Sequence, residues 1–225
     1  MKILGVIPAR IGSKRLKEKN IKLLNGEPLI SYTINSAKKS KKMNKLIVST
    51  DSEKIANIAK KYEVDVPFIR PEQLAGDDVR NSDTLLHSLD YFESIGEYFD
   101  AVILLQPTSP FRSSTDIDNA IDIFLENECD TLASVKGPYK KRDINIKKII
   151  DNKLVNYSDN NINEEYYIYN AAIYIVKVSY LKKYKKFVST NEVAYVMNDI
   201  SSVDIDTNLD FIVAQAFINK GLIHE

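Results

Sequence analysis

The sequence predicts a single α/β domain with a Rossmann-like, mostly parallel sheet flanked by helices. Short apolar runs alternate four times with helical patterns, as in right-handed β–α–β crossovers. The first run, at 3–7, is short, almost wholly apolar and bounded by Pro8, which is typical of a strand buried on both faces. The chain has 225 residues, enough for one sizeable domain and too few for two ordinary domains with a linker.

The first half of the chain supplies the predicted parallel strands and their crossover helices. Pro28 opens one helical pattern at its first turn, and apolar residues at i, i+3, i+4 and i+7 predict another helix after Asp51. Asp51 itself is interpreted as a capping or turn residue. The run AVILL is the most apolar and is therefore expected near the sheet centre. In order, the predicted elements are a strand at 3–7, a helix at 28–39, a strand at 45–50, a helix from 53, a strand at 64–69, a helix from 82, a strand at 101–105 and a helix at 117–125.

The second half of the chain departs from this alternation. After a strand at 131–135, the segment 147–157 predicts a hairpin around Asp151 and Asn152. The region at approximately 138–170 therefore resembles an insertion, and its aromatic-rich strand offers apolar surface for a subunit contact. A strand at 193–197 and a last helix at 209–220 follow. The last helix carries Leu209, Ile212, Val213, Ala216 and Phe217 on one face.

Composition and charge exclude several classes of protein. The 31 basic and 31 acidic residues balance, so no overall field would attract nucleic acid or an anionic membrane. The single cysteine, Cys129, excludes an intramolecular disulfide and fits a reducing cytosol. No apolar stretch approaches the roughly 20 residues that span a bilayer, and the first apolar run is too short for a signal peptide. We expect a soluble, cytoplasmic protein.

A cationic loop follows the first predicted strand. Its sequence, PARIGSKRLKEKN, places five cations around Gly12 and Ser13. Ligands of open α/β sheets bind beyond the carboxyl ends of strands, where backbone N–H groups and basic side chains can hold phosphate oxygens. The loop therefore predicts a polyphosphate site, with a solvated basic loop as the alternative. It lacks both G-x-G-x-x-G and G-x-x-x-x-G-K-[ST], so neither a dinucleotide-binding turn nor a P-loop is indicated.

Asp204 and Asp206 form a candidate metal site. They are two residues apart, which puts both carboxylates on one face of an extended segment. Mg²⁺ usually binds one or two carboxylates together with substrate phosphates. The alternative is structural, because Thr207 and Asp210 fit a capping box and Asp206 would then support a helix start. Combined with the cationic loop, the pair predicts a nucleoside triphosphate site.

Four motifs, in order, resemble the acylneuraminate cytidylyltransferases. The resemblance extends along nearly the whole chain and implies a fold of the nucleotide-diphospho-sugar transferase type. It implies transfer of CMP from CTP to the anomeric hydroxyl of a nine-carbon nonulosonic acid, with release of pyrophosphate. The implied cofactor is Mg²⁺, with Mn²⁺ as an alternative, and the implied partner is a second copy that makes a homodimer through the insertion. The motifs are PARIGSKRLKEKN, QPTSPFR at 106–112, NAAIYI at 170–175 and SVDIDT at 202–207.

The resemblance also implies roles for single residues. Arg10, Lys14, Asp204 and Asp206 are the implied catalytic group, and the two aspartates are the implied metal ligands. The implied nucleotide-binding residues are Arg10, Gly12, Ser13, Lys14, Asn20, Arg70 and Asn81, and the implied sugar-binding residues are Gln106, Thr108, Ser109, Lys140 and Asn170.

Three departures from the family pattern leave the identity of the sugar open. Arg15 stands where many members have glycine, an arrangement that also resembles the pseudaminate and Kdo branches. Ile168 and Tyr169 stand where sialate enzymes often carry an arginine, and Ala171 replaces a glycine. QPTSPFR favours N-acetylneuraminate or legionaminate. The alternatives are a pseudaminate or Kdo cytidylyltransferase, a non-catalytic nucleotide-binding module, and a plain α/β domain with a basic loop.

Overall fold

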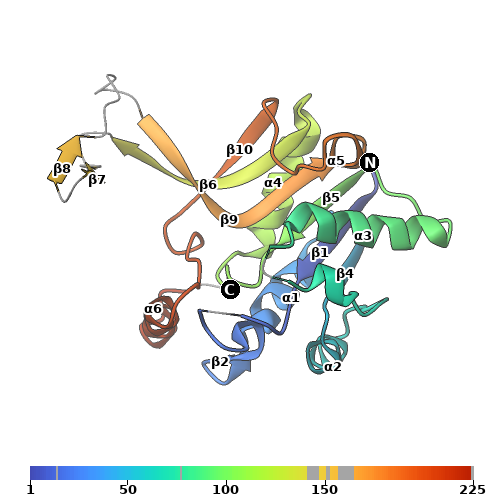
Figure 1. Ribbon diagram of the computed structural model, residues 1–225, viewed down its shortest axis with the longest axis horizontal. Coiled ribbons are helices and arrows are strands. Elements are labelled where there is room, and N and C mark those ends of the chain that lie inside the picture. The colour runs from blue at the N-terminus through green and yellow to red at the C-terminus, as the bar shows by residue number, and fades with distance from the viewer. Residues whose placement is uncertain (14, 77, 141–146, 151–152, 157–164, 224–225) are drawn as a thin grey trace.

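The computed structural model describes residues 1–13, 15–76, 78–140, 147–150, 153–156 and 165–223, with the backbone alone for 140, 147–150 and 153–156. Its centre is a six-stranded sheet with the order β10-β6-β9-β5-β1-β4 (Figure 1). The β1 strand is parallel to β4 and β5, and β10 is parallel to β6, so the predicted α/β fold with a mostly parallel sheet is confirmed. The strands are β1 (Ile3–Pro8), β4 (Lys45–Ser49), β5 (Ala101–Leu105), β6 (Thr131–Lys140), β9 (Glu165–Lys177) and β10 (Glu192–Met197).

Helices cover both faces of this sheet. One core cluster joins the sheet to α1, α2 and α4, and a second joins its other face to α3 and α5. Ile3 and Ile7 lie in the first cluster and Leu4 and Val6 in the second, which confirms that β1 is buried on both faces. The helices are α1 (Leu29–Lys39), α2 (Glu53–Lys61), α3 (Asn81–Ser94), α4 (Ser114–Glu126), α5 (Val178–Tyr184) and α6 (Asn208–Asn219), with 3₁₀ turns η1 (Lys19–Ile21) and η2 (Glu72–Leu74).

The length and apolar character needed to cross a membrane are found in no helix of the described part of the chain.

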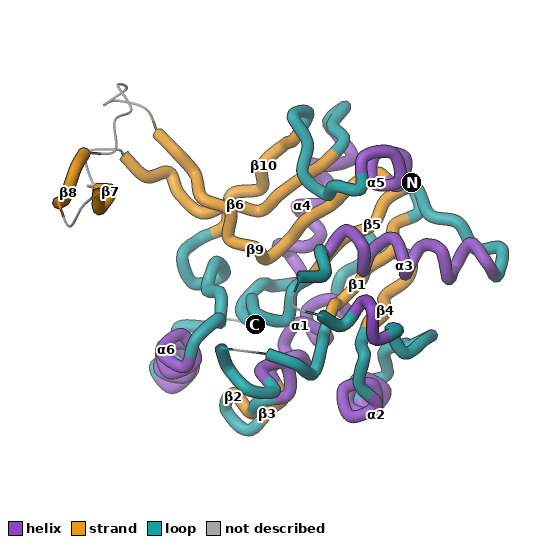
Figure 2. Tube along the Cα trace, viewed as in Figure 1, coloured by secondary structure: helices purple, strands orange, loops and turns teal. Residues whose placement is uncertain are grey.

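Two small hairpins lie outside the main sheet. The first joins β2 (Leu23–Leu24) to β3 (Glu27–Pro28). The second, β7 (Lys147–Ile150) with β8 (Lys153–Asn156), is the hairpin that the sequence predicts. Its turn residues, 151 and 152, lie outside the described residues. The paired ends of β6 and β9 project away from the helices toward this hairpin, and we call approximately residues 138–170 the arm (Figure 1, Figure 2).

Two sequence-based expectations for secondary structure need correction. The strand predicted at 64–69 is wrong, because only two isolated bridges form there, at Asp65 and Ile69. Pro67 lies between them and has no N–H group to donate to a ladder. Most of the apolar face that the sequence picks out on α6 points outward, although its last member, Phe217, packs against the core. Ile212 is 57% exposed, whereas Phe211 packs into the core.

The β9 strand carries an irregularity where it passes β6. The pairing jumps from Ala133↔Tyr174 to Val135↔Tyr169, so residues 170–173 lie opposite Ser134. Ile173 N donates to Ser134 Oγ at 2.8 Å, and this hydroxyl donates to Asn170 Oδ1 at 2.5 Å. The extra residues form a bulge in which the side chain of Ser134 replaces the missing ladder bonds.

We expect Ala171→Gly to stabilise the protein by about 0.5–1 kcal/mol. Ala171 has a φ of 60° within this bulge, a left-handed conformation that strains a side chain with a Cβ atom but not glycine. The measurement is the free energy of unfolding in urea. Ala172→Gly is the matched control, since Ala172 is buried and has no positive φ, and it should destabilise. Equal losses from both substitutions would contradict the strain at position 171.

Candidate active site

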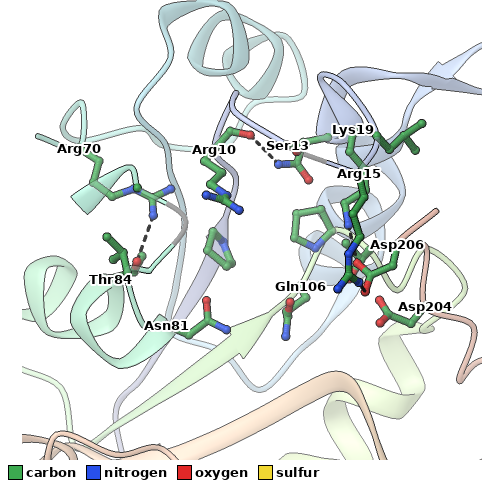
Figure 3. A pocket seen from close by; sticks show the side chains of 17 residues that line it. Arg10, Ser13, Arg15, Lys19, Arg70, Asn81, Thr84, Gln106, Asp204 and Asp206 are labelled. Carbon is green, nitrogen blue, oxygen red and sulfur yellow. Dashed lines mark hydrogen bonds and ion pairs between the residues drawn. The ribbon is translucent and has the colours of Figure 1, made fainter. Parts of the chain in front are cut away.

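A cleft of ≈ 460 Å³ lies beyond the carboxyl ends of β1 and β5, the place where open α/β sheets bind ligands (Figure 3). Four separate segments line it: the loop after β1, the stretch from 70 to the start of α3, the turn after β5, and the extended segment before α6. The lining residues are Pro8, Arg10, Ser13, Arg15, Leu16, Lys19, Asn20, Arg70, Gly76, Val79, Asn81, Thr84, Gln106, Pro107, Thr108, Asp204 and Asp206.

The loop after β1 is held to the neighbouring strand end by side chains. Ile11 N donates to Asp51 Oδ1 at 3.0 Å, and Asn20 Nδ2 donates to the Arg10 carbonyl at 2.8 Å. Asp51 is therefore an anchor of the loop. Of its two sequence-based interpretations, the cap is wrong, because the N-cap of α2 is Ser52, and the turn agrees with the bend at Asp51. These bonds fix the backbone from which Arg10 and Ser13 reach the cleft.

Arg70 forms the opposite wall of the cleft (Figure 3). Its guanidinium donates to the Ser49 carbonyl and to Thr84 Oγ1, both at 3.0 Å. Burial lowers the pKa of Arg70, while nearby Asp51 acts in the opposite direction. Asn81, at the start of α3, also lines the cleft. The cleft lining thus combines a fixed positive charge with the amide of Asn81.

The turn after β5 is tied to its surroundings from two sides. Arg112 is fully buried, donates to the Ala172 carbonyl at 2.7 Å and to the Gln106 carbonyl at 3.3 Å, and has a pKa that burial lowers to about 9. The Thr108 carbonyl accepts from Ile205 N at 2.8 Å. The turn thus connects the bulge in β9 to the acidic segment before α6.

The two carboxylates of the acidic segment have different environments. Asp206 accepts from Arg15 at 3.1 Å and from Lys19 Nζ at 2.8 Å. Burial raises the pKa of Asp204, and the Asp206 charge adds to this effect against a hydrogen bond from Thr108. Asp204 Oδ1 is buried and has no hydrogen-bond partner among the described residues. Asp206 is neutralised by cations, and Asp204 keeps an unused acceptor.

The start of α6 shows which residues cap this helix. Thr207 is the N-cap, and its hydroxyl accepts from Asp210 N in a complete capping box. Asp210 Oδ2 in turn accepts from the N–H groups of Asp206 and Thr207 at 3.0 and 2.7 Å. The cap is therefore Thr207 with Asp210, and the carboxylates of Asp204 and Asp206 both face the cleft.

The donor set of the cleft suits Mg²⁺. Within the described ranges, three or more His, Cys, Asp or Glu side chains nowhere gather as a metal cage. Mg²⁺ does not need such a cage, because it usually binds one or two carboxylates and completes its shell with water and phosphate oxygens. The unused oxygen of buried Asp204 is an available ligand of this kind.

Most of the site residues named from the sequence meet in this cleft. Lys14 lies outside the described residues, as does the side chain of Lys140. Ser109 and Asn170 are buried away from the cleft, and Gly12 is exposed on its loop without lining it. Lys19 also lines the cleft, although the family resemblance gave it no role; it stands in the first motif and directly precedes buried Asn20. The residues that the cleft brings together are Arg10, Ser13, Asn20, Arg70, Asn81, Gln106, Thr108, Asp204 and Asp206.

Fold and cleft together define an α/β nucleotidyltransferase. A solved CMP:2-keto-3-deoxy-manno-octonic acid synthetase, complexed with CTP, has the same fold, with a TM-score of 0.77 over 98% of this chain and 100% of the other at 16% identity. A family model described as cytidylyltransferase matches residues 4–208.

Two curated relatives are similar over almost the whole chain. The CMP-N,N'-diacetyllegionaminic acid synthase of Legionella pneumophila is 37% identical, covering 96% of this chain and 95% of the relative. The N-acylneuraminate cytidylyltransferase of Escherichia coli is 36% identical over 95% of this chain, which spans 51% of that longer protein. The chain belongs to the acylneuraminate cytidylyltransferase family and is an enzyme of the nucleotidyltransferase class.

We expect Asp204→Asn to raise the free energy of unfolding of the metal-free protein at neutral pH. Burial raises the pKa of Asp204, so the ionised carboxylate is disfavoured in the folded protein relative to the unfolded chain. This penalty is present above the raised pKa and disappears as the pH falls below the ordinary Asp pKa of about 3.9.

Urea unfolding in EDTA, from about pH 8 down to about pH 4, measures this effect, and the gain of the variant should shrink with falling pH. Asp206→Asn is the comparison, because Asp206 is ion-paired and its loss should bring no gain. A gain that grows toward acid would contradict the prediction.

Proposed function

We propose that this enzyme is a CMP-nonulosonate synthetase, which transfers CMP from CTP to the anomeric hydroxyl of an N-acetylneuraminate- or legionaminate-type sugar and releases pyrophosphate. The observation that carries the proposal is the cleft itself, in which the cationic loop contacts Asp206 and lines the same cavity as Asp204. The full-length similarity to a legionaminic acid synthase supports the sugar class.

On the nucleotide side, basic groups would hold the triphosphate. Arg10, Lys19 and Arg70 line the cleft from two walls, and charge-assisted hydrogen bonds from such groups to phosphate are among the stronger polar interactions. Lys14 belongs to the proposed set through its motif. Gly12 and Ser13 would contribute backbone N–H groups, and Asn20 would act by holding the Arg10 carbonyl. Asn81 completes the proposed nucleotide wall.

On the sugar side, Gln106 and Thr108 are the proposed contacts, since both line the cleft. Ser109 and Asn170 are buried and would shape the acceptor pocket from behind. Asn170 donates to Ser202 Oγ at 2.9 Å, which ties the bulge to the segment that carries the carboxylates. Lys140 stays in the proposal through its place in the motif order alone.

Asp204 and Asp206 would hold Mg²⁺, or Mn²⁺ as an alternative, whose charge neutralises the phosphates. The chain's own contribution is then positioning. The loop and the Arg70 wall hold the α-phosphorus in line with the acceptor hydroxyl, and the preorganised cations stabilise the charge that develops on the leaving pyrophosphate.

The arm is the proposed dimerisation insertion of a single domain covering 1–225. Tyr167, Ile168 and Tyr169 are exposed at its base, and an apolar patch of this kind is typical of an interface. The proposed partner is a second copy of this chain, with no nucleic acid or membrane. A cytoplasmic location is part of the proposal, because CTP is a cytoplasmic nucleotide and Cys129 is a free thiol.

The deciding experiment offers N-acetylneuraminate, legionaminate, pseudaminate and Kdo separately, with CTP and Mg²⁺, and measures pyrophosphate release. We expect release with one of the first two sugars. Release with pseudaminate or Kdo alone would move the enzyme to the alternative sugar class. Silence with all four, together with measurable CTP binding, would favour a non-catalytic nucleotide-binding module.

We expect Asp206→Asn to lower kcat by roughly 10²-fold or more, because metal neutralisation of phosphate charge contributes several kcal/mol. Circular dichroism and urea unfolding should show an intact fold. Asp199→Asn is the matched control, since Asp199 is an exposed carboxylate shortly before the same segment and outside the described cleft lining. Wild-type turnover in Asp206→Asn would remove the metal role assigned to this residue.

A further inference from the structure

The two cations that pair with Asp206 differ in how exposed they are and in how many hydrogen bonds they make. Lys19 is 14% exposed in its side chain and donates to both Asp206 Oδ1 and the Ile205 carbonyl, each at 2.8 Å. Arg15 is 72% exposed and reaches Asp206 Oδ2 at 3.1 Å (Figure 3). Lys19 is therefore a fixed part of the cleft. The Arg15 pair is an exposed contact that contributes little stability and can be exchanged.

The described lining of the cleft carries an excess of positive charge. Arg10, Arg15, Lys19 and Arg70 face only two carboxylates, although the chain as a whole has a formal net charge of zero. A nucleoside triphosphate carries more negative charge than one divalent cation neutralises, so its metal complex remains anionic. The cation excess matches such a complex.

A carboxylate oxygen that coordinates a metal ion no longer accepts from a guanidinium in the same direction. Metal binding at Asp206 would therefore release Arg15 at the open side of the cleft. A released guanidinium has a rigid fork of donors that suits phosphate oxygens. Arg15 lines the cleft and is 72% exposed, so a released guanidinium would meet phosphate groups on their way to solvent.

We propose that Arg15 is an exchangeable binding residue, which pairs with Asp206 until the metal and nucleotide arrive and then holds the phosphates that leave as pyrophosphate. This inference rests on the proposed function and extends it to a residue that has no role in the mechanism above. It assigns a purpose to Arg15 at a position where many members of the family have glycine.

The exchange predicts two effects of opposite sign in one variant. When the guanidinium of Arg15 is removed, the charge of Asp206 is less neutralised, so a divalent cation alone should bind more tightly. The same loss removes a phosphate ligand, so pyrophosphate should bind more weakly. A simple surface ion pair would tighten cation binding without weakening pyrophosphate binding, and general damage to the cleft would weaken both ligands.

The test compares Arg15→Gln with Lys17→Gln. Lys17 is an exposed cation of the same loop and is not among the described residues that line the cleft. In Arg15→Gln, Mn²⁺ alone, titrated by the loss of its free electron paramagnetic resonance signal, should bind roughly two- to fivefold more tightly. Pyrophosphate with Mg²⁺, measured by calorimetry, should bind about tenfold more weakly. Lys17→Gln should leave both constants unchanged.

A double variant isolates the pair. Asp206→Asn removes the partner carboxylate, so adding Arg15→Gln to it should leave Mn²⁺ binding unchanged. An unchanged Mn²⁺ or pyrophosphate constant in Arg15→Gln, or equal changes in Lys17→Gln, would overturn the exchange. Both titrations are made without sugar or turnover. Failure of pyrophosphate release with every sugar would therefore overturn the proposed function, while these titrations would still decide the role of Arg15.

Discussion

The ion pair between Lys19 and Asp206 joins the first loop of the chain to its last extended segment across 187 positions of sequence. It lies next to an apolar cluster that includes Leu16 from that loop and Ile205 and Phe211 from the segment and α6. The apolar contacts bring the two segments together, and the ion pair sets the distance between their charged groups. The geometry of the cleft depends on this closure, because the cationic loop and the carboxylates belong to opposite ends of the chain.

Sequence patterns predict those parts of the fold whose causes are local. The apolar run of β1, the helical spacing after Pro28 and the strand at 101–105 all carry their period and breakers in the chain itself. The direction of β9 is different. Its apolar run reads the same in either orientation, and it lies antiparallel between β5 and β6 because the chain returns from the arm. Which face of α6 is buried could not be predicted from its sequence either. The helix is apolar nearly all round, and only its packing partner determines that Ile212 points outward.

The site, too, could be predicted only in part from the sequence. A cationic loop after a buried strand is predictable, since parallel strands end at one edge of the sheet and their loops meet there. The partners of individual groups are not predictable from the sequence. Asp51 has the spacing of a helix cap, yet its carboxylate anchors Ile11, because the β4 end lies beside the loop. Asn170 stands in a recognisable motif, yet the bulge turns its amide toward Ser134 and Ser202 inside the protein.

A buried polar atom without a hydrogen-bond partner can belong to a functional site or to a residue that only stabilises the fold. Its surroundings distinguish the two cases. Arg112 has two guanidinium nitrogens without a described partner, as Asp204 has one such oxygen. Arg112 belongs to the segment between β5 and α4 and is not in the described cleft lining, and its remaining nitrogen donates to two backbone carbonyls. Asp204 opens onto a cleft of excess positive charge beside a second carboxylate. Arg112 therefore stabilises the fold, whereas Asp204 has an acceptor oxygen that a bound ligand or metal ion can use. The combination of an unused acceptor, an accessible cleft and complementary charge therefore marks Asp204 as part of the site and Arg112 as its support.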